Sequence, residues 1–149
     1  MKTHKKIIIC ASGYFDPIHS GHINYLKEAK KLGDKLIVIL NNDFQAKLKK
    51  KHYFMPLHER KKILEAIKYV DEVFVSIDKT RDINKSLKKI KPDIFAVGTD
   101  NVKEKLAEKK VCDELGIKVV DKLAKTFFKQ SSSKIIHEYL KVRGLIEEI

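Results

Sequence analysis

Five short runs of apolar residues recur along the chain, and segments with a helical spacing of apolar positions separate them. Nearly continuous apolar runs of this length are typical of parallel strands that are buried on both faces. The expected strands are Lys5–Ala11, Lys35–Leu40, Glu72–Ser76, Asp93–Val97 and Ile117–Val120. The alternation of strands and helices predicts one α/β domain over residues 1–149, with a parallel sheet that helices cover on both faces.

A lysine-rich segment, Lys47–His52, follows the second expected strand. Charge this dense does not pack into a core, so we expect a mobile, solvated loop. The segment also follows the carboxyl end of a central strand, where its lysines can act as a lid over a phosphate group. This position favours the lid over a plain solvated loop.

The expected helices carry apolar stripes that predict buried faces, including the last two helices of the chain. The helix that ends at Leu115, before Gly116, is expected to bury Ala107, Val111 and Leu115. The last helix begins at the serines that follow Gln130. Its expected buried stripe is Ile135, Ile136, Tyr139 and Leu140.

The first strand leads into Gly13–His22, which reads Gly-Tyr-Phe-Asp-Pro-Ile-His-Ser-Gly-His, and then into a helix. A strand, a glycine-containing turn and a helix N-terminus in this order make an anion site, because free backbone N–H groups and the positive end of the helix dipole point out of the turn. His19 and His22 are three residues apart at the helix start, so their rings can face the same space. A histidine ring donates hydrogen bonds and can be charged near neutral pH, which suits a phosphate whose charge grows during a reaction.

Two later segments also have residues that suit a phosphate or a nucleotide. Gly98-Thr99-Asp100 ends the fourth strand, where Gly98 permits close backbone approach and Asp100 can cap a helix or hold a ribose hydroxyl. Ser131, Ser132 and Ser133 stand at a helix start, where they offer hydroxyl and backbone N–H groups. Capping alone would explain one of the three serines.

The first of these motifs resembles the Gly-x-Phe-Asp-x-x-His-x-Gly-His signature of the cytidylyltransferase-like nucleotidyltransferases. This superfamily includes cytidylyltransferases that act on glycerol 3-phosphate and phosphocholine, and adenylyltransferases that act on heptose 1-phosphate, on pantetheine phosphate or to form FAD. The segment from Gln130 to Ile135 resembles the family's second signature. A glycine turn with two capping histidines is the simpler interpretation, but it leaves Phe15, Asp16 and the register of both histidines unexplained. The resemblance implies a Rossmann-like fold with a five-stranded sheet in the order 3-2-1-4-5.

The resemblance also implies roles for individual residues. His19 and His22 would stabilise the transition state, Lys49 or Lys51 would close over the phosphates, and Arg60 would hold the incoming phosphate; the alternative for Arg60 is a surface arginine at a helix start. Mg²⁺ would bind the phosphates, with Asp16 as its candidate protein ligand. The implied nucleotide-binding residues are Gly13, Tyr14, Phe15, Asp16, Gly21, His22, Gly98, Asp100, Ser131, Ser132 and Ser133.

The net charge of +12 admits a nucleic acid, an acidic membrane surface or a small anionic substrate as the partner. Its lysines are spread along the helices, and aromatic residues do not alternate with arginines, which disfavours nucleic acid. No apolar run has the length of a membrane span. Cys10 and Cys112 lack metal-ligand spacing and indicate free thiols in a reducing compartment, so we expect a cytoplasmic protein.

The expected reaction is the transfer of a nucleoside monophosphate from CTP or ATP to a small sugar phosphate or polyol phosphate, with release of pyrophosphate. Tyr14, in place of the family's threonine, and Thr126–Gln130, without the expected arginine and glycine, depart from the glycerol-phosphate enzymes. The two alternatives are a nucleotide-binding regulatory module without turnover and a basic nucleic-acid-binding protein. The resemblance also makes a homodimer an expectation.

Overall fold

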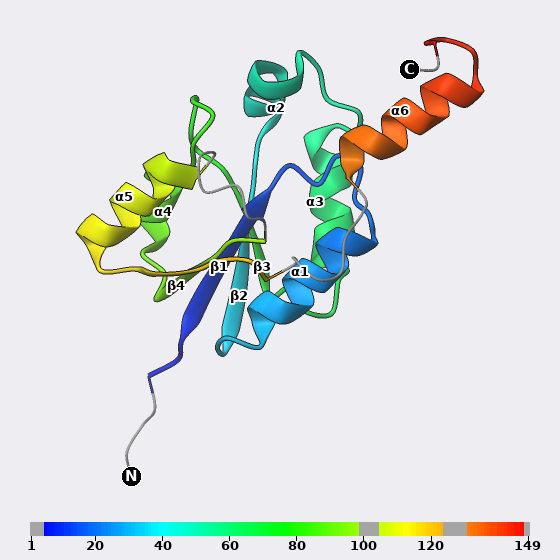
Figure 1. The fold of residues 1–149 in the computed structure, drawn as a ribbon. Coiled ribbons are helices and arrows are strands. Elements are labelled where there is room, and N and C mark those ends of the chain that lie inside the picture. Colours follow the sequence, from blue (N-terminus) through cyan, green and yellow to red (C-terminus); the bar gives the residue numbers. More distant parts are fainter. Residues whose placement is uncertain (1–4, 99–104, 124–130, 148–149) are drawn as a thin grey trace.

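Five parallel strands in the order β3-β2-β1-β4-β5 form the central sheet of this computed structural model, which describes residues 5–98, 105–123 and 131–147 (Figure 1). The strands are β1 (Ile8–Gly13), β2 (Lys35–Leu40), β3 (Glu72–Val75), β4 (Ile94–Ala96) and β5 (Lys118–Val120). Each neighbouring pair runs parallel, so all the carboxyl ends meet at one edge of the sheet. This arrangement confirms the predicted α/β class and strand order.

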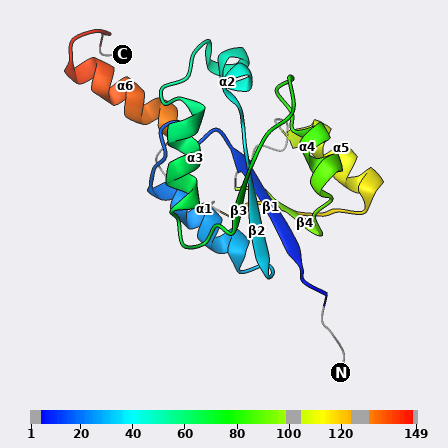
Figure 2. The ribbon, with the colours of Figure 1, turned by 180° about the vertical axis from the view of Figure 1, so that it is seen from behind.

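Helices cover both faces of the sheet (Figures 1 and 2). One face carries α1 (Ser20–Lys30) and α3 (Leu57–Glu65), and the other carries α4 (Asn84–Ile90) and α5 (Leu106–Leu115). Successive side chains of a strand point to opposite faces, so Ile9 joins the first core cluster while Cys10 joins the second. The central strands are therefore apolar on both sides, as their sequence predicted.

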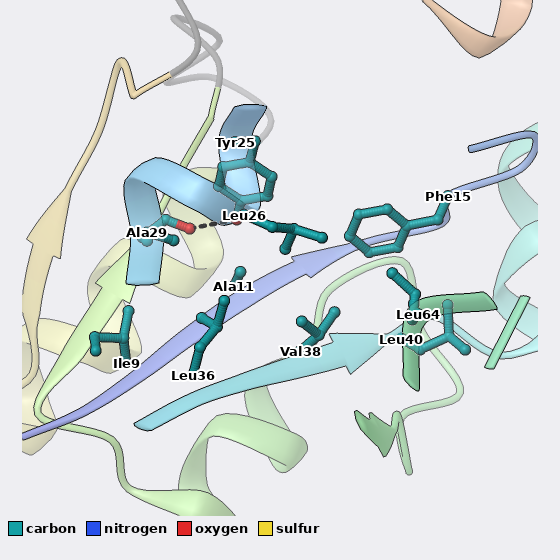
Figure 3. Packing of buried hydrophobic residues seen from close by; sticks show 11 residues of the cluster. Ile9, Ala11, Phe15, Tyr25, Leu26, Ala29, Leu36, Val38, Leu40 and Leu64 are labelled. Atoms are coloured by element: carbon teal, nitrogen blue, oxygen red, sulfur yellow. Dashed lines mark hydrogen bonds between the residues drawn. The ribbon is translucent and has the colours of Figure 1, made fainter. Parts of the chain in front are cut away.

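The signature loop after β1 is anchored in the first core cluster. The Phe15 ring is buried and lies with Leu40 and Leu64 at the carboxyl end of β2 (Figure 3). Tyr25 of α1 is also buried, and its hydroxyl donates to the carbonyl of Ala96 at 2.6 Å and accepts from the backbone N of Ser12 at 3.1 Å. These contacts fix α1 against the ends of both β1 and β4.

The expected mobile loop is instead part of a helix, α2 (Asp43–Lys50), and that prediction was wrong. Asn42 caps the helix, since its side chain accepts from the backbone N of Gln45, and the Gln45 side chain in turn accepts from the backbone N of Asn42. Gln45 and Ala46 are buried, so α2 has an inner face and the lysines of its last turn lie on the remainder. A reciprocal cap and one buried face are enough to order a short, highly charged helix.

The buried stripe expected on the last helix is also wrong. In α6 (Ser132–Val142) no residue is buried, and Tyr139 is 59% exposed. Figures 1 and 2 show α6 leading away from the sheet and from the other helices. Ile135, Ile136 and Leu140 are half-buried, so the described part of this chain covers the stripe only in part.

The buried face of α5 consists of different side chains from those expected. Val111 is buried as predicted, whereas Ala107 and Leu115 are exposed. Glu108 and Cys112 are buried instead. Among the described helices, none has the length and apolar character that a membrane crossing requires.

Candidate active site

An open pocket of about 1430 Å³ lies where β1, β2 and β4 end. Its walls come from the signature loop, the start of α1, the end of α2, the loop after β3, the start of α5 and the first turns of α6. The predicted site residues on these walls are Gly13, Tyr14, Phe15, Asp16, His19, Gly21, His22, Lys49, Gly98, Ser131, Ser132 and Ser133. Lys51 and Arg60 do not line the pocket, and Asp100 lies outside the described residues.

His19 and His22 lie side by side, with ring centroids 3.9 Å apart. The Nδ1 atom of His19 accepts from the backbone N of Gly21 at 3.0 Å, and the Nδ1 atom of His22 accepts from the backbone N of His19 at 3.1 Å. Because a neutral imidazole carries one proton, both rings have theirs on Nε2. The start of α1 therefore fixes two imidazoles in the same tautomer, each with an N–H donor.

Burial favours the neutral form of both histidines in the protein without ligands. Burial, with smaller contributions from the neighbouring His19 and Lys50, lowers the pKa of His22 to about 3. Burial also lowers the pKa of His19. A bound phosphate would favour the charged rings and raise both pKa values. The pair is thus poised to respond to negative charge that arrives or develops beside it.

The serines at the start of α6 have separate partners. The Ser131 hydroxyl caps the helix by accepting from the backbone N of Lys134 at 3.0 Å. The Ser132 hydroxyl donates to the carbonyl of Pro17 at 2.7 Å, which ties α6 to the signature loop. All three serines line the pocket, so the N-terminus of α6 and that of α1 border the same space.

Of the lysines at the end of α2, Lys49 and Lys50 line the pocket and Lys51 does not. The Lys49 Nζ atom lies 4.7 Å from the centre of the Tyr14 ring, and the Lys50 Nζ atom donates to the carbonyl of Asp16 at 2.9 Å. Burial lowers the pKa of Lys50. Lys51 ends the helix with a left-handed backbone and lies off the pocket wall. Sequence reasoning selected Lys49 and missed Lys50, because the choice among adjacent lysines depends on the helix register.

Arg60 lies inside the fold and not on the pocket wall. Only 1% of the residue is exposed, and its guanidinium donates to the carbonyls of Met55, Tyr14 and Asn41 at 2.8–2.9 Å. It also donates to the Asp43 carboxylate at 2.6 Å. Arg60 therefore joins three loops at the carboxyl edge of the sheet, which differs from the predicted contact with an incoming phosphate.

Asp16 is also occupied by the protein itself. It is fully buried, and its two carboxylate oxygens accept from the backbone N atoms of Phe54 at 2.7 Å and Met55 at 2.5 Å. These bonds do not fit the predicted role as a metal ligand. Across the described ranges, no three His, Cys, Asp or Glu side chains gather in a way that would hold a metal ion.

Sequence reasoning missed charged residues on the far wall of the pocket, including Arg81, Lys105 and Glu108. Arg81 reaches the wall on a loop that Gln45 holds, because the Gln45 side-chain amide donates to the carbonyls of Thr80 at 2.8 Å and Asp82 at 3.0 Å. Glu108 is buried beside Lys105, and one of its carboxylate oxygens has no hydrogen-bond partner among the residues that the structure describes. Neither segment carries a motif, so the sequence gives no signal for them.

The model of the cytidylyltransferase-like family matches residues 10–138, which include both histidines and the α6 serines. The chain belongs to this family. FAD synthase from Archaeoglobus fulgidus is 36% identical over 141 residues, which are 90% of this chain and 98% of that protein. FAD synthase from Thermococcus kodakarensis is 42% identical over 100 residues, or 66% of each chain.

Another FAD synthase, from Ferroglobus placidus, is 46% identical over 96 residues, which are 64% of this chain and 60% of that protein. This chain therefore spans just under two thirds of the length of several such relatives. Among solved structures, the lipopolysaccharide core biosynthesis protein of Thermoplasma volcanium has a TM-score of 0.68 and 33% identity, covering 78% of this chain and 96% of that one. A protein of unknown function from Archaeoglobus fulgidus, 16% identical with a TM-score of 0.64, shares the fold.

Proposed function

We propose that this protein is an adenylyltransferase that transfers AMP from ATP to FMN and so forms FAD. The pair of Nε2–H donors at the start of α1, in a pocket that the α6 N-terminus also borders, supports nucleotidyl transfer. The shared name of the archaeal relatives supports ATP and FMN as the substrates. The names of these relatives do not support a small sugar phosphate as the acceptor, which the sequence led us to expect. FMN does, however, carry its phosphate on a polyol chain.

In the proposed reaction an oxygen of the FMN phosphate attacks the α-phosphorus of ATP in line. The new P–O bond forms as the bond between the α-phosphorus and its bridging oxygen breaks, and pyrophosphate leaves with the electron pair. A phosphate monoester is already a nucleophile near neutral pH, so positioning and charge stabilisation are the protein's tasks. The Nε2–H groups of His19 and His22 donate to the reacting phosphates, and the α6 N-terminus holds the leaving pyrophosphate.

Charge in the remainder of the pocket suits the same reaction. Lys49 and Lys50 bring two cations to the wall beside Tyr14, and Arg81 brings a third from the loop after β3. Mg²⁺ would be carried by the triphosphate, because Asp16 already accepts two backbone N–H groups. When bound, the ion would neutralise phosphate charge.

Both alternatives from the sequence predict different behaviour. A regulatory module would bind ATP and release no pyrophosphate, whereas the two fixed imidazole donors favour a site built for turnover. A nucleic-acid-binding protein would bind oligonucleotides with a steep salt dependence and no requirement for ATP.

A cytoplasmic location and a homodimer stay predictions. The first is consistent with Cys10 and Cys112, which are free and buried, so that their thiol pKa values rise to about 12 and about 11.

The test is a matrix of substrates. ATP and CTP are each combined with FMN and with glycerol 3-phosphate in the presence of Mg²⁺, and pyrophosphate and the nucleotide product are measured. The proposal predicts FAD and an equal amount of pyrophosphate from ATP with FMN, and little product from the other pairs. Turnover with glycerol 3-phosphate but not with FMN would refute the acceptor, and no pyrophosphate from any pair would favour the regulatory module.

A further inference from the structure

Phe54 is a large apolar side chain that is exposed at the wall of the active-site pocket. It is 61% exposed, in the connector between α2 and α3, and it lines the pocket. Burying a phenylalanine ring stabilises a fold, and an exposed ring forgoes much of that stabilisation. An exposed ring on a pocket wall is a candidate contact for an apolar part of a ligand.

The backbone around Phe54 is held by buried charges on both sides. The fully buried Asp16 carboxylate accepts from the backbone N atoms of Phe54 and Met55, at 2.7 Å and 2.5 Å. The carbonyl of Met55 accepts from the Arg60 guanidinium at 2.9 Å. The ring is therefore presented from a fixed backbone position, which limits the entropy lost when a ligand binds.

Other aromatic and cationic side chains lie on the same side of the pocket. Tyr14 and His52 line the wall with Phe54, and the Nζ atoms of Lys49 and Lys50 lie 4.7 Å and 5.6 Å from the centre of the Tyr14 ring. Such a wall combines flat apolar surfaces with positive charge. It suits a ligand that has both a planar ring system and a phosphate.

A second exposed aromatic residue provides a comparison within the same region. Phe44 of α2 is 54% exposed, close to the value for Phe54, but it does not line the pocket. If exposed aromatic residues here served a protein partner, both would be expected to matter. If the pocket ligand is the occupant, Phe54 alone should affect it.

We propose that Phe54 is the residue on which the isoalloxazine ring of the acceptor stacks, and that it thereby selects a flavin over a sugar phosphate. This inference rests on the proposed function. The flexible ribityl chain lets the ring lie on the connector while the phosphate reaches the histidines of α1. Stacking of a planar ring on an aromatic side chain is worth about 1–3 kcal/mol, which corresponds to roughly a five- to 150-fold change in affinity.

The test compares Phe54→Ala, Phe54→Tyr and the matched control Phe44→Ala with the wild-type protein. Flavin fluorescence is quenched on stacking, so a titration of FMN with each protein gives both an affinity and a quenching amplitude. We expect Phe54→Ala to weaken FMN binding and to raise the KM for FMN by roughly tenfold, with a smaller residual quench. The KM for ATP should not change, and Phe54→Tyr and Phe44→Ala should both behave as the wild type.

The outcomes separate this inference from the function on which it rests. If the wild-type protein forms FAD and Phe54→Ala has an unchanged KM for FMN, the stacking role is overturned and the adenylyltransferase stands. If the wild-type protein neither binds FMN nor forms FAD, the proposed function fails and the stacking role fails with it. Equal losses in Phe54→Ala and Phe44→Ala would also overturn the stacking role, because only one of these rings lines the pocket.

Discussion

The buried Arg60 provides the sharpest contrast between a structural role and a phosphate-binding role. A surface arginine that bound the substrate could be removed with little effect on folding. The structure instead gives its guanidinium four protein acceptors, three carbonyls and the Asp43 carboxylate, and leaves 1% of the residue exposed. Arg60→Met keeps much of the side-chain volume and removes every one of these donors.

The magnitude follows from the groups that lose their donor. Each buried carbonyl left unsatisfied costs about 1–3 kcal/mol, and breaking a buried ion pair costs about 3–5 kcal/mol. The Asp43 side chain is 32% exposed, so water can replace part of its lost contact. With each of the three carbonyls at the lower end of its range and the ion pair discounted for water, a total of at least about 4 kcal/mol is expected, out of a typical unfolding free energy of about 5–15 kcal/mol. For a chain of this size the melting temperature should fall by about 8–16 °C.

Thermal unfolding without ligands is the assay, and Arg81→Met is the matched control. Arg81 is an exposed arginine on the pocket wall, so its loss should leave the melting temperature within about 2 °C of the wild type. Arg60→Lys should fall between the wild type and Arg60→Met, because an ammonium cannot reproduce the planar fork of the guanidinium. An Arg60→Met protein that melts with the wild type but has lost FMN binding would refute this reasoning and restore the phosphate-binding role.

Three further substitutions test other contacts. Tyr25→Phe removes a buried hydroxyl that has two backbone partners, so urea unfolding should show a loss of about 1–3 kcal/mol; an unchanged midpoint would contradict the importance of those bonds. Burial raises the pKa of Glu108, so the native state binds its proton more tightly than the unfolded state and stability falls as pH rises through the raised pKa. Glu108→Gln should therefore melt above the wild type at about pH 8 and with it below about pH 4, and the opposite order would contradict the assigned burial cost. Gly33→Ala places a methyl group 2.4 Å from Ile9 Cδ1 and 2.8 Å from the carbonyl oxygen of Ile7, and differential scanning calorimetry should show a destabilisation of about 1–3 kcal/mol, not a gain.

The sheet and the main loop of the site could be predicted because local patterns determine them. The apolar run at Lys35–Leu40 matches β2 residue for residue, since a central parallel strand is buried on both faces. The glycines and histidines of Gly13–His22 mark a turn into a helix, and the structure places His19 at its N-cap. Both signals lie within a few consecutive residues.

The features that could not be predicted from the sequence depend on packing between segments that are distant in the chain. The lysine run at the end of α2 suggested a loop, although Asn42 and Gln45 carried a readable capping signal that would have corrected it. The position of Arg60 near a helix start does not reveal that three loops surround it. The apolar spacing of α6 predicts an apolar face, but it does not reveal which surface, if any, packs against that face.

The measurement that tests the account most directly follows the α-phosphate of ATP. ATP labelled at that phosphate is incubated with FMN and Mg²⁺, and the label in FAD is measured for the wild-type protein and for His22→Ala. We predict label in FAD with the wild type and a loss of roughly a hundredfold or more in rate for His22→Ala, whose melting temperature should stay close to the wild type. Transfer by His22→Ala at the wild-type rate, or no label in FAD with either protein, would contradict it.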